Sequence, residues 1–151
     1  MPVKSRKQMT SPTHQDLQKF LGQLELAVME IIWQRETVTV RDVLTALQKE
    51  RTLAYTTVMT IMQRLTDKGL LLEEKAGKAH RYIAAQTREN FIASLAANSA
   101  RSLLNDFGEV AMVQFVKELE ALDPNQLARL ADLAYAAQDN EDESQNASPK
   151  A

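Results

Sequence analysis

The sequence predicts a mainly α-helical protein with one small β-hairpin, and three observations support that fold class. Apolar residues recur at helical spacing in three segments before residue 69. Two short strand-like runs then flank a glycine-containing turn, the usual sign of a hairpin. Three further helical segments follow residue 87 and contain no strand signal. We therefore expect a domain of helices and one hairpin, followed by an all-helical segment.

The first half of the chain gives the expected element order. Residues 21–34 and 41–50 are predicted helices, and the β-branched stretch 37–40 between them suits a small strand or an extended entry. A third predicted helix covers 53–68 and stops at Gly69, a residue type that commonly ends helices. Strand-like runs at 70–75 and 80–84 surround the turn Ala76-Gly77-Lys78. Helix, short strand, helix, helix, hairpin is the order of a winged helix-turn-helix domain.

The third predicted helix has an unusual polar face. Solvent-exposed helices favour long charged residues, whereas threonine is a weaker helix former. A face of Thr, Gln and Arg suits a DNA major groove, whose base edges offer hydrogen-bond partners. The apolar side of this helix holds Val58, Ile61, Met62 and Leu65, and the polar side holds Thr56, Thr57, Thr60, Gln63, Arg64 and Asp67.

The second half of the chain is predicted to be a dimerisation module. Thr87 is expected to cap one helix, a second begins near Glu109, and Asp123-Pro-Asn-Gln126 opens a third. Three short helices with apolar stripes cannot readily close a core alone, so we expect them to pack against a second copy. The residues assigned to this surface are Phe91, Leu95, Leu103, Met112, Phe115, Val116, Leu119, Leu127, Leu130 and Ala134.

Length and charge set the domain boundaries that we expect. A chain of 151 residues with 44% hydrophobic composition suffices for one domain, or for a small domain with a helical module. The predicted parts are a flexible N-terminal arm (1–20), a winged-helix DNA-binding domain (21–86), a helical dimerisation domain (87–138) and an acidic disordered tail (139–151). The net charge of -2 does not exclude nucleic-acid binding, because basic residues outnumber acidic ones between positions 54 and 85.

Several function classes are disfavoured. No apolar run reaches the roughly 20 residues that span a bilayer, so we expect a cytoplasmic protein with no membrane partner. The absence of cysteine excludes disulfides and thiolate metal sites. His14 and His80 are too few and too far apart in the sequence to indicate a metal site or a catalytic base. Without a Gly-rich phosphate loop or a Ser-His-acid pattern, we expect no enzymatic activity, no metal and no cofactor.

Four stretches, 24–33, 40–43, 53–70 and 79–82, resemble the penicillinase-repressor (BlaI/MecI/CopY) family. The resemblance covers roughly residues 21–137 and is weaker after Thr87. It implies a homodimeric transcriptional repressor whose third helix enters the major groove of a palindromic operator. Tyr55, Thr56, Thr57, Thr60 and Arg64 stand at the positions that match the family's reading helix. The implied partners are double-stranded operator DNA and a second copy of the chain.

Two family traits do not transfer directly. Copper-responsive members bind metal through C-terminal cysteines, which this chain lacks. The β-lactam-responsive members are inactivated by proteolysis at an Asn-Phe bond in the dimerisation domain. Gln114-Phe115 aligns with that bond here, while Asn105-Asp106-Phe107 lies nearby without matching it. An inactivating protease or a small-molecule inducer therefore both stay open as further partners.

Ordinary structural interpretations compete with DNA contact at several positions of the third helix. Arg64 could pair with Asp67 on a solvated helix, although the family match favours a base or phosphate contact. The threonines could cap the helix or hydrogen-bond back to its carbonyls. Tyr55 could pack its ring or offer its hydroxyl to a phosphate. Trp33, Met59 and Met62 are expected in the core.

The predicted wing has its own alternatives. We expect Lys78 to contact phosphate. For Lys75 and Arg81 a solvated surface and a phosphate contact are equally compatible with the sequence, because Glu73 and Glu74 are close by. At the level of the whole chain, the competing hypotheses are an adaptor that docks a protein partner with little DNA contact, and a repressor with a ligand pocket between its domains.

Overall fold

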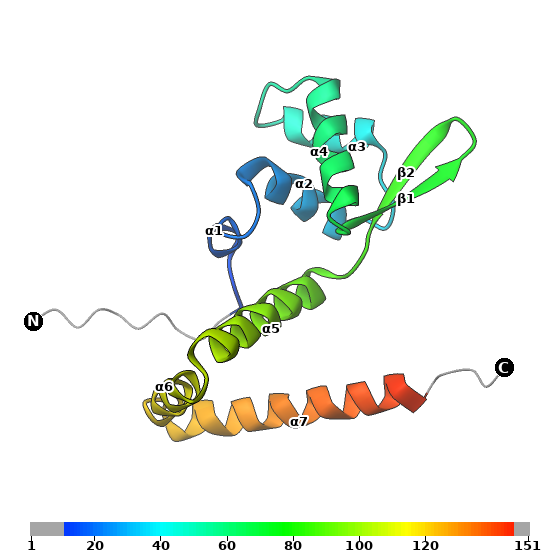
Figure 1. The fold of residues 1–151 in the computed structure, drawn as a ribbon. Coiled ribbons are helices and arrows are strands. Elements are labelled where there is room, and N and C mark those ends of the chain that lie inside the picture. The colour runs from blue at the N-terminus through cyan, green and yellow to red at the C-terminus, as the bar shows by residue number, and fades with distance from the viewer. Residues whose placement is uncertain (1–10, 147–151) are drawn as a thin grey trace, which may run out of the picture. The chain divides into compact units, whose positions relative to one another are not determined.

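The computed structural model describes residues 11–146 of the chain. These residues form two compact units, which divide at Ala96 and Ala97. The elements run in the order α1 (His14–Leu17), α2 (Gln23–Trp33), α3 (Val40–Gln48), α4 (Tyr55–Asp67), β1 (Leu71–Ala76), β2 (Ala79–Ala84), α5 (Arg88–Phe107), α6 (Glu109–Glu120) and α7 (Pro124–Asn146) (Figure 1).

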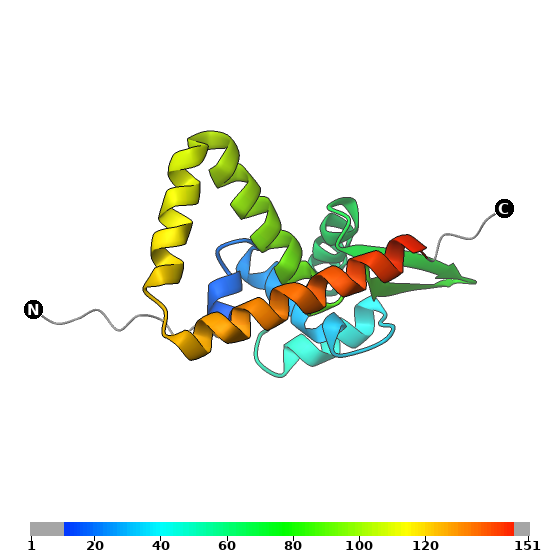
Figure 2. The ribbon, with the colours of Figure 1, turned by 90° about the horizontal axis from the view of Figure 1, so that it is seen from below.

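Helices α2, α3 and α4 enclose the core of the first unit. Each presents an apolar side to the other two, and the base of the hairpin adds Leu71 and Tyr82 to the same cluster. Val58, Met62 and Leu65 of α4 have no exposed surface at all, as expected for its apolar side. Figures 1 and 2 show the hairpin extending away from these helices. This arrangement is a winged helix, and it confirms the fold class read from the sequence.

The wing is a regular antiparallel pair joined by a two-residue turn. Its register places Leu71 opposite Ala84 and Ala76 opposite Ala79. Gly77 in the turn has a φ of 65°, a left-handed conformation that glycine adopts without steric strain. Val38 adds a single bridge to Tyr82, with backbone N–H···O distances of 3.0 and 2.8 Å. The expected extended entry at 37–40 is therefore confirmed as this bridge, and Val40 already begins α3.

The described part of the expected N-terminal arm differs from the prediction. A short helix, α1, forms where we expected irregular chain, and its Leu17 is only 1% exposed in the core. Thr13 and Asp16 make a reciprocal capping box, which supplies partners for the first N–H groups of the helix. Burial of Leu17 then holds this turn of helix against the first unit. Residues 1–10 of the arm lie outside the described part of the chain.

The first turns of α5 belong to the first compact unit, which extends past Gln86 to Ala96. Phe91 is 5% exposed within the core of the first unit, and Leu95 packs against that core. The Phe91 ring lies 5.2 Å from the ring of Trp33, whose indole N–H donates to the Gln86 carbonyl at 3.2 Å. Phe91 and Leu95 were predicted to lie in the dimer interface, but Phe91 is already buried within one protomer. An apolar helix stripe does not reveal from the sequence which partner will bury it.

The second unit, from Ala97, contains the rest of α5 together with α6 and α7. Gly108, with a φ of 55°, separates α5 from α6. Asp123 caps α7 by accepting from the Gln126 N–H at 2.9 Å, as the sequence predicted. The helix then continues to Asn146, beyond the expected start of an irregular tail at 139. No glycine or proline interrupts residues 125–146, which explains the continuation.

Candidate nucleic-acid interface

Helix α4 divides into a buried side and a polar side, as the sequence predicted. Its exposed polar residues are Thr56, Thr57, Thr60, Gln63, Arg64 and Asp67. The helix is therefore fixed by its apolar side while a row of hydrogen-bonding side chains faces outward.

The two ends of α4 are capped differently. At the C-terminal end, the Leu70 N–H donates to the Leu65 carbonyl and the Gly69 N–H donates to the Thr66 carbonyl, which is a Schellman motif. Lys68 adds an ion pair with Glu25 of α2 at 2.9 Å. At the N-terminal end, no side chain caps the helix. The Thr57 N–H already donates to the Ala54 carbonyl at 3.1 Å, which leaves the N–H groups before it for an external acceptor. The capping role considered for the threonines is not present.

One alternative for the threonines is confirmed. The Thr60 hydroxyl donates to the Thr56 carbonyl at 2.9 Å, so its proton is used within the helix and only its oxygen lone pairs remain for a ligand. Thr66 donates to the Met62 carbonyl in the same way. The polar side of α4 thus has fewer free donors than its composition suggests.

Arg64 lies on one flank of α4 and has no ion pair within residues 11–146, so the suggested pair with Asp67 does not form. It shares a groove of about 550 Å³ with Thr56, Thr57 and Thr60. The opposite wall of this groove is the start of α2, from Gly22 to Glu25. The structure therefore brings the expected residues of α4 together with the start of α2, which was not predicted to be part of this site.

The other flank of α4 faces the wing across a groove of about 260 Å³. Tyr55, Met59 and Gln63 line it from α4, and Lys78 and His80 line it from the hairpin. The Tyr55 ring is partly covered by Arg41, whose guanidinium carbon lies 6.0 Å from the ring centroid. Arg41 belongs to α3 and reaches this groove only through the packing of α3 against α4, which the sequence does not show.

The strand register assigns the wing cations to faces. Tyr82 and His80 line the groove, so Arg81 between them points to the opposite face, where it stands across from Glu74. Lys75 stands across from His80 and shares the groove-side face. Of the three cations considered in the wing, Lys78 and Lys75 therefore lie on the side of α4, and Arg81 does not.

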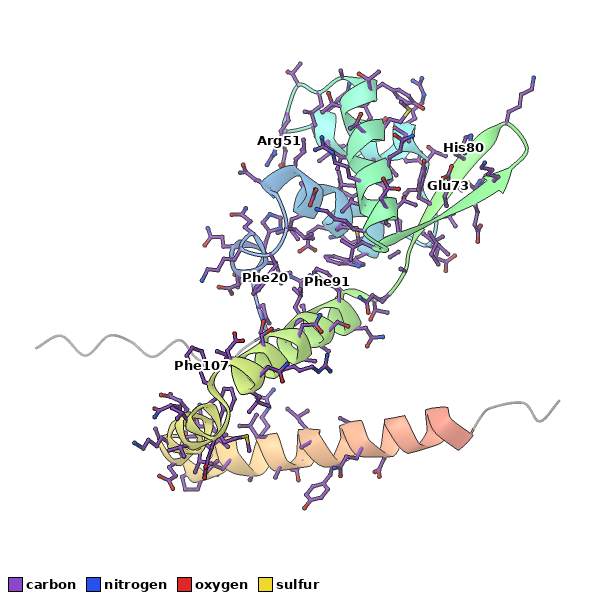
Figure 3. The ribbon with its side chains drawn as sticks, in the orientation of Figure 1. Phe20, Arg51, Glu73, His80, Phe91 and Phe107 are labelled. Atoms are coloured by element: carbon purple, nitrogen blue, oxygen red, sulfur yellow. The ribbon has the colours of Figure 1, made fainter. Side chains whose placement is uncertain are left out.

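Acidic and aromatic groups shape the wing-side groove. Glu73 and His80 are hydrogen-bond partners, with Oε1 and Nδ1 2.5 Å apart (Figure 3). Tyr82 is 4% exposed at the base of the wing, and burial raises the pKa of its phenol, helped by the nearby Glu73 and Tyr55. Its hydroxyl therefore stays protonated at neutral pH.

A second exposed surface belongs to the helices of the second unit. Side chains that would be buried in a self-sufficient domain are between 37% and 52% exposed at six of the positions assigned to dimerisation: Leu103, Met112, Phe115, Val116, Leu119 and Leu127. Leu130 is half-buried and Ala134 is exposed. The bond between Gln114 and Phe115 lies in the middle of α6, so its backbone is helical.

Neither a cluster of metal-binding side chains nor a membrane-spanning helix occurs among the described residues. Within residues 11–146, no three His, Cys, Asp or Glu side chains gather closely enough to hold a metal ion. None of the helices in that range has both the length and the apolar character needed to cross a membrane.

Comparison with known proteins identifies the family. The penicillinase repressor family model matches residues 21–136. This chain belongs to the penicillinase repressor family. The family resemblance read from the sequence is therefore confirmed. The match includes the winged helix, α5, α6 and the first turns of α7.

Individual members of the family are similar over most of the chain. The transcriptional regulators BlaI of two Mycobacterium tuberculosis strains, CDC 1551 / Oshkosh and H37Rv, are 44% identical over 117 residues, covering 75% of this chain and 84% of theirs. Among solved structures, the DNA-binding domain of the repressor BlaI is 28% identical and covers 47% of this chain and 87% of its own, with a TM-score of 0.43. A structure of the DNA recognition and protein interaction domains of HOP2 is 26% identical over 40% of this chain and 95% of its own, with a TM-score of 0.37.

Proposed function

We propose that this chain is a homodimeric transcriptional repressor that inserts α4 into the major groove of a palindromic operator. The observation that carries the proposal is the exposed polar side of α4, bordered by a groove on each flank, in a member of the penicillinase repressor family. A B-DNA major groove is about 12 Å wide and admits one helix, so the two phosphate backbones run along the helix flanks. The outer walls of these grooves, at the wing and at the start of α2, are where those backbones would lie, while α4 between them faces the base edges.

Phosphate contacts would fix the orientation of α4. On the wing side, Lys78, Tyr55 and Arg41 would contact one backbone; Lys78 and Tyr55 line the groove, and Arg41 lies against the Tyr55 ring. On the other side, the start of α2 has no side-chain cap, like the start of α4, and both leave N–H groups for phosphate oxygens. Such contacts position the protein without reading sequence, which falls to the side chains of α4.

A second copy would supply the symmetry. The exposed apolar residues of α5, α6 and α7 suit a shared core between two protomers. In the proposed dimer, two α4 helices enter successive major grooves about 34–36 Å apart on one face of the DNA. Repression follows where the operator overlaps a promoter, because the bound dimer excludes the polymerase.

Release from the operator would need a signal that acts on the dimer. Proteolysis between Gln114 and Phe115 requires local unfolding of α6, because that bond lies within a helix. A protease would therefore act on a transiently opened segment. A small-molecule inducer is the alternative, and a compound that binds the folded protein would raise its apparent stability in a thermal shift measurement.

Selection of bound sequences from a randomised DNA pool tests the proposal. We expect enrichment of a palindrome whose half-sites are about one helical turn apart. If the dimer neutralises roughly 8 phosphates, the logarithm of its affinity should fall with the logarithm of salt concentration at a slope near -7. Absence of an enriched sequence, together with a flat salt response, would instead support an adaptor that docks a protein partner.

A further inference from the structure

Few side chains on the polar side of α4 can distinguish one base pair from another. A threonine hydroxyl pairs with several bases, and that of Thr60 already donates to the Thr56 carbonyl. Discrimination is strongest for side chains that make two hydrogen bonds to one base edge, which Arg and Gln can do. Gln63 and Arg64 are the two exposed α4 residues of these types.

The two residues point to different flanks of the helix. Successive residues of an α-helix are separated by about 100°. Accordingly, Arg64 lines the groove beside α2, whereas Gln63 lines the groove beside the wing. Side chains that leave one helix on different flanks approach the base edges from different sides, so Gln63 and Arg64 would make separate contacts.

The Gln63 amide is also available to hydrogen-bond with a ligand. It is exposed, and no hydrogen bond joins it to another residue within the described range. Lys78 and Tyr55 border the same groove and would hold the adjacent backbone in place. The nearby carboxylate of Glu73 is engaged by His80. The Gln63 amide therefore presents its NH2 group as a donor and its oxygen as an acceptor, next to a DNA backbone that the wing would hold in place.

We propose that Gln63 reads an adenine in each operator half-site, at a base pair separate from the one contacted by Arg64. The amide oxygen would accept from adenine N6, and the amide nitrogen would donate to adenine N7. This assignment rests on the proposed function, since it requires α4 to lie in the major groove.

The test compares sequences selected from the randomised pool by the full-length wild-type protein, Gln63→Ala and Gln63→Glu. Gln63→Ala should lose preference at one A·T pair in each half-site, with affinity falling roughly 5- to 150-fold for each half-site contact that is lost. Gln63→Glu should change the preferred base at that position from adenine to cytosine, because a carboxylate only accepts and cytosine N4 donates. Arg64→Ala should alter a different position.

The matched control is Gln48→Glu, which introduces the same charge at an exposed position at the end of α3. It should select the wild-type sequence. If the wild-type protein enriches a palindrome but Gln63→Ala enriches the same palindrome with every preference intact, Gln63 does not read a base. If no protein enriches any sequence, the proposed function itself fails, so the two failures are distinguishable.

Discussion

Lys78 and Arg81 lie three residues apart on different faces of the same hairpin, and they form a matched pair for testing phosphate contact. Lys78 borders the groove beside α4, whereas Arg81 stands across from Glu74 on the other face. Lys78→Ala should weaken binding to all DNA sequences similarly and reduce the salt slope by about 2 for the dimer, one for each lost contact. Titrations of operator and random DNA at several salt concentrations measure both effects. Arg81→Ala is the control, and an equal loss there would show that the wing approaches DNA by its other face.

The capping box of α3 predicts how stability depends on acid. The Thr39 N–H donates to Asp42 at 2.9 Å and the Asp42 N–H donates to the Thr39 hydroxyl at 3.1 Å. The backbone hydrogen bond from Thr39, followed by the Thr39 hydroxyl, lowers the pKa of the Asp42 carboxyl. Because the folded carboxylate holds its proton less tightly than the unfolded one, the stabilisation is fully present above the ordinary pKa of aspartate. It is lost as pH falls through the lowered pKa.

Asp42→Ala should therefore lower the free energy of unfolding by about 1 kcal/mol at pH 7 and by less near pH 3. The side chain is exposed, so solvent screening keeps the effect small. Urea denaturation at the two pH values measures the difference. Asp67→Ala, at the opposite end of a helix, is the control because a carboxylate there gains nothing from the helix dipole. Equal losses for Asp42→Ala at both pH values would exclude the ionised cap as their cause.

At the scale of the elements, the hairpin depends on the backbone of its turn. Gly77 has a φ of 65°, and a Cβ added there would meet no atom within 4 Å. Gly77→Ala should therefore cost about 1–2 kcal/mol through backbone strain alone, without a steric clash. Urea denaturation measures this cost. Gly22→Ala is the comparison, because its nearest neighbour would be 3.7 Å away in ordinary contact and its φ of -54° suits any residue. A neutral Gly77→Ala would mean that the turn relaxes freely.

The sequence predicted those elements whose signals are local. The periodicity of α4, its stop at Gly69 and the turn at Gly77 are all contained in short segments, and the structure has each where expected. Helix α1 has only 4 residues, too few to show periodicity, and its burial depends on distant partners. Phe91, predicted for the dimer surface, is buried in the core of the first unit, and this burial also depends on distant partners. Local pattern fixes an element, but only tertiary packing decides what covers its apolar side.

The residues of the candidate interface likewise fall into those that the sequence predicts and those that only the packing reveals. The polar residues of α4 could be identified from helical spacing, because they belong to one element. Arg41 and the residues from Gly22 to Glu25 could not, since they reach α4 from other helices. The assignment of Lys78 and Arg81 to opposite faces of the hairpin could not be made from the sequence, because it depends on the strand register. The hydrogen bond from the Thr60 hydroxyl to the Thr56 carbonyl could not be predicted from the sequence, because it depends on the side-chain rotamer of Thr60.

At the scale of the whole molecule, the second unit lacks a core of its own. Between residues 97 and 139, only Ala111 is buried, while Phe107, Val110 and Tyr135 are at least 60% exposed. Segments of this size rarely supply enough apolar burial to fold alone. Association with a second copy would remove this surface from water, and it would also link two α4 helices. Folding of the second unit and operator affinity should therefore depend on the same contacts.

Phe115→Glu tests that link. A charge at this apolar position should shift the protein from dimer to monomer in sedimentation experiments, because burying an unpaired carboxylate is strongly unfavourable. Operator affinity should fall by at least about 100-fold, since each monomer then binds a half-site without the effective concentration supplied by its partner. Affinity for an isolated half-site should stay within about twofold, because α4 belongs to the first unit. Gln114→Glu places the same charge on the same helix at an exposed polar position and should remain dimeric. A dimeric Phe115→Glu protein with normal operator affinity would move the interface away from α6.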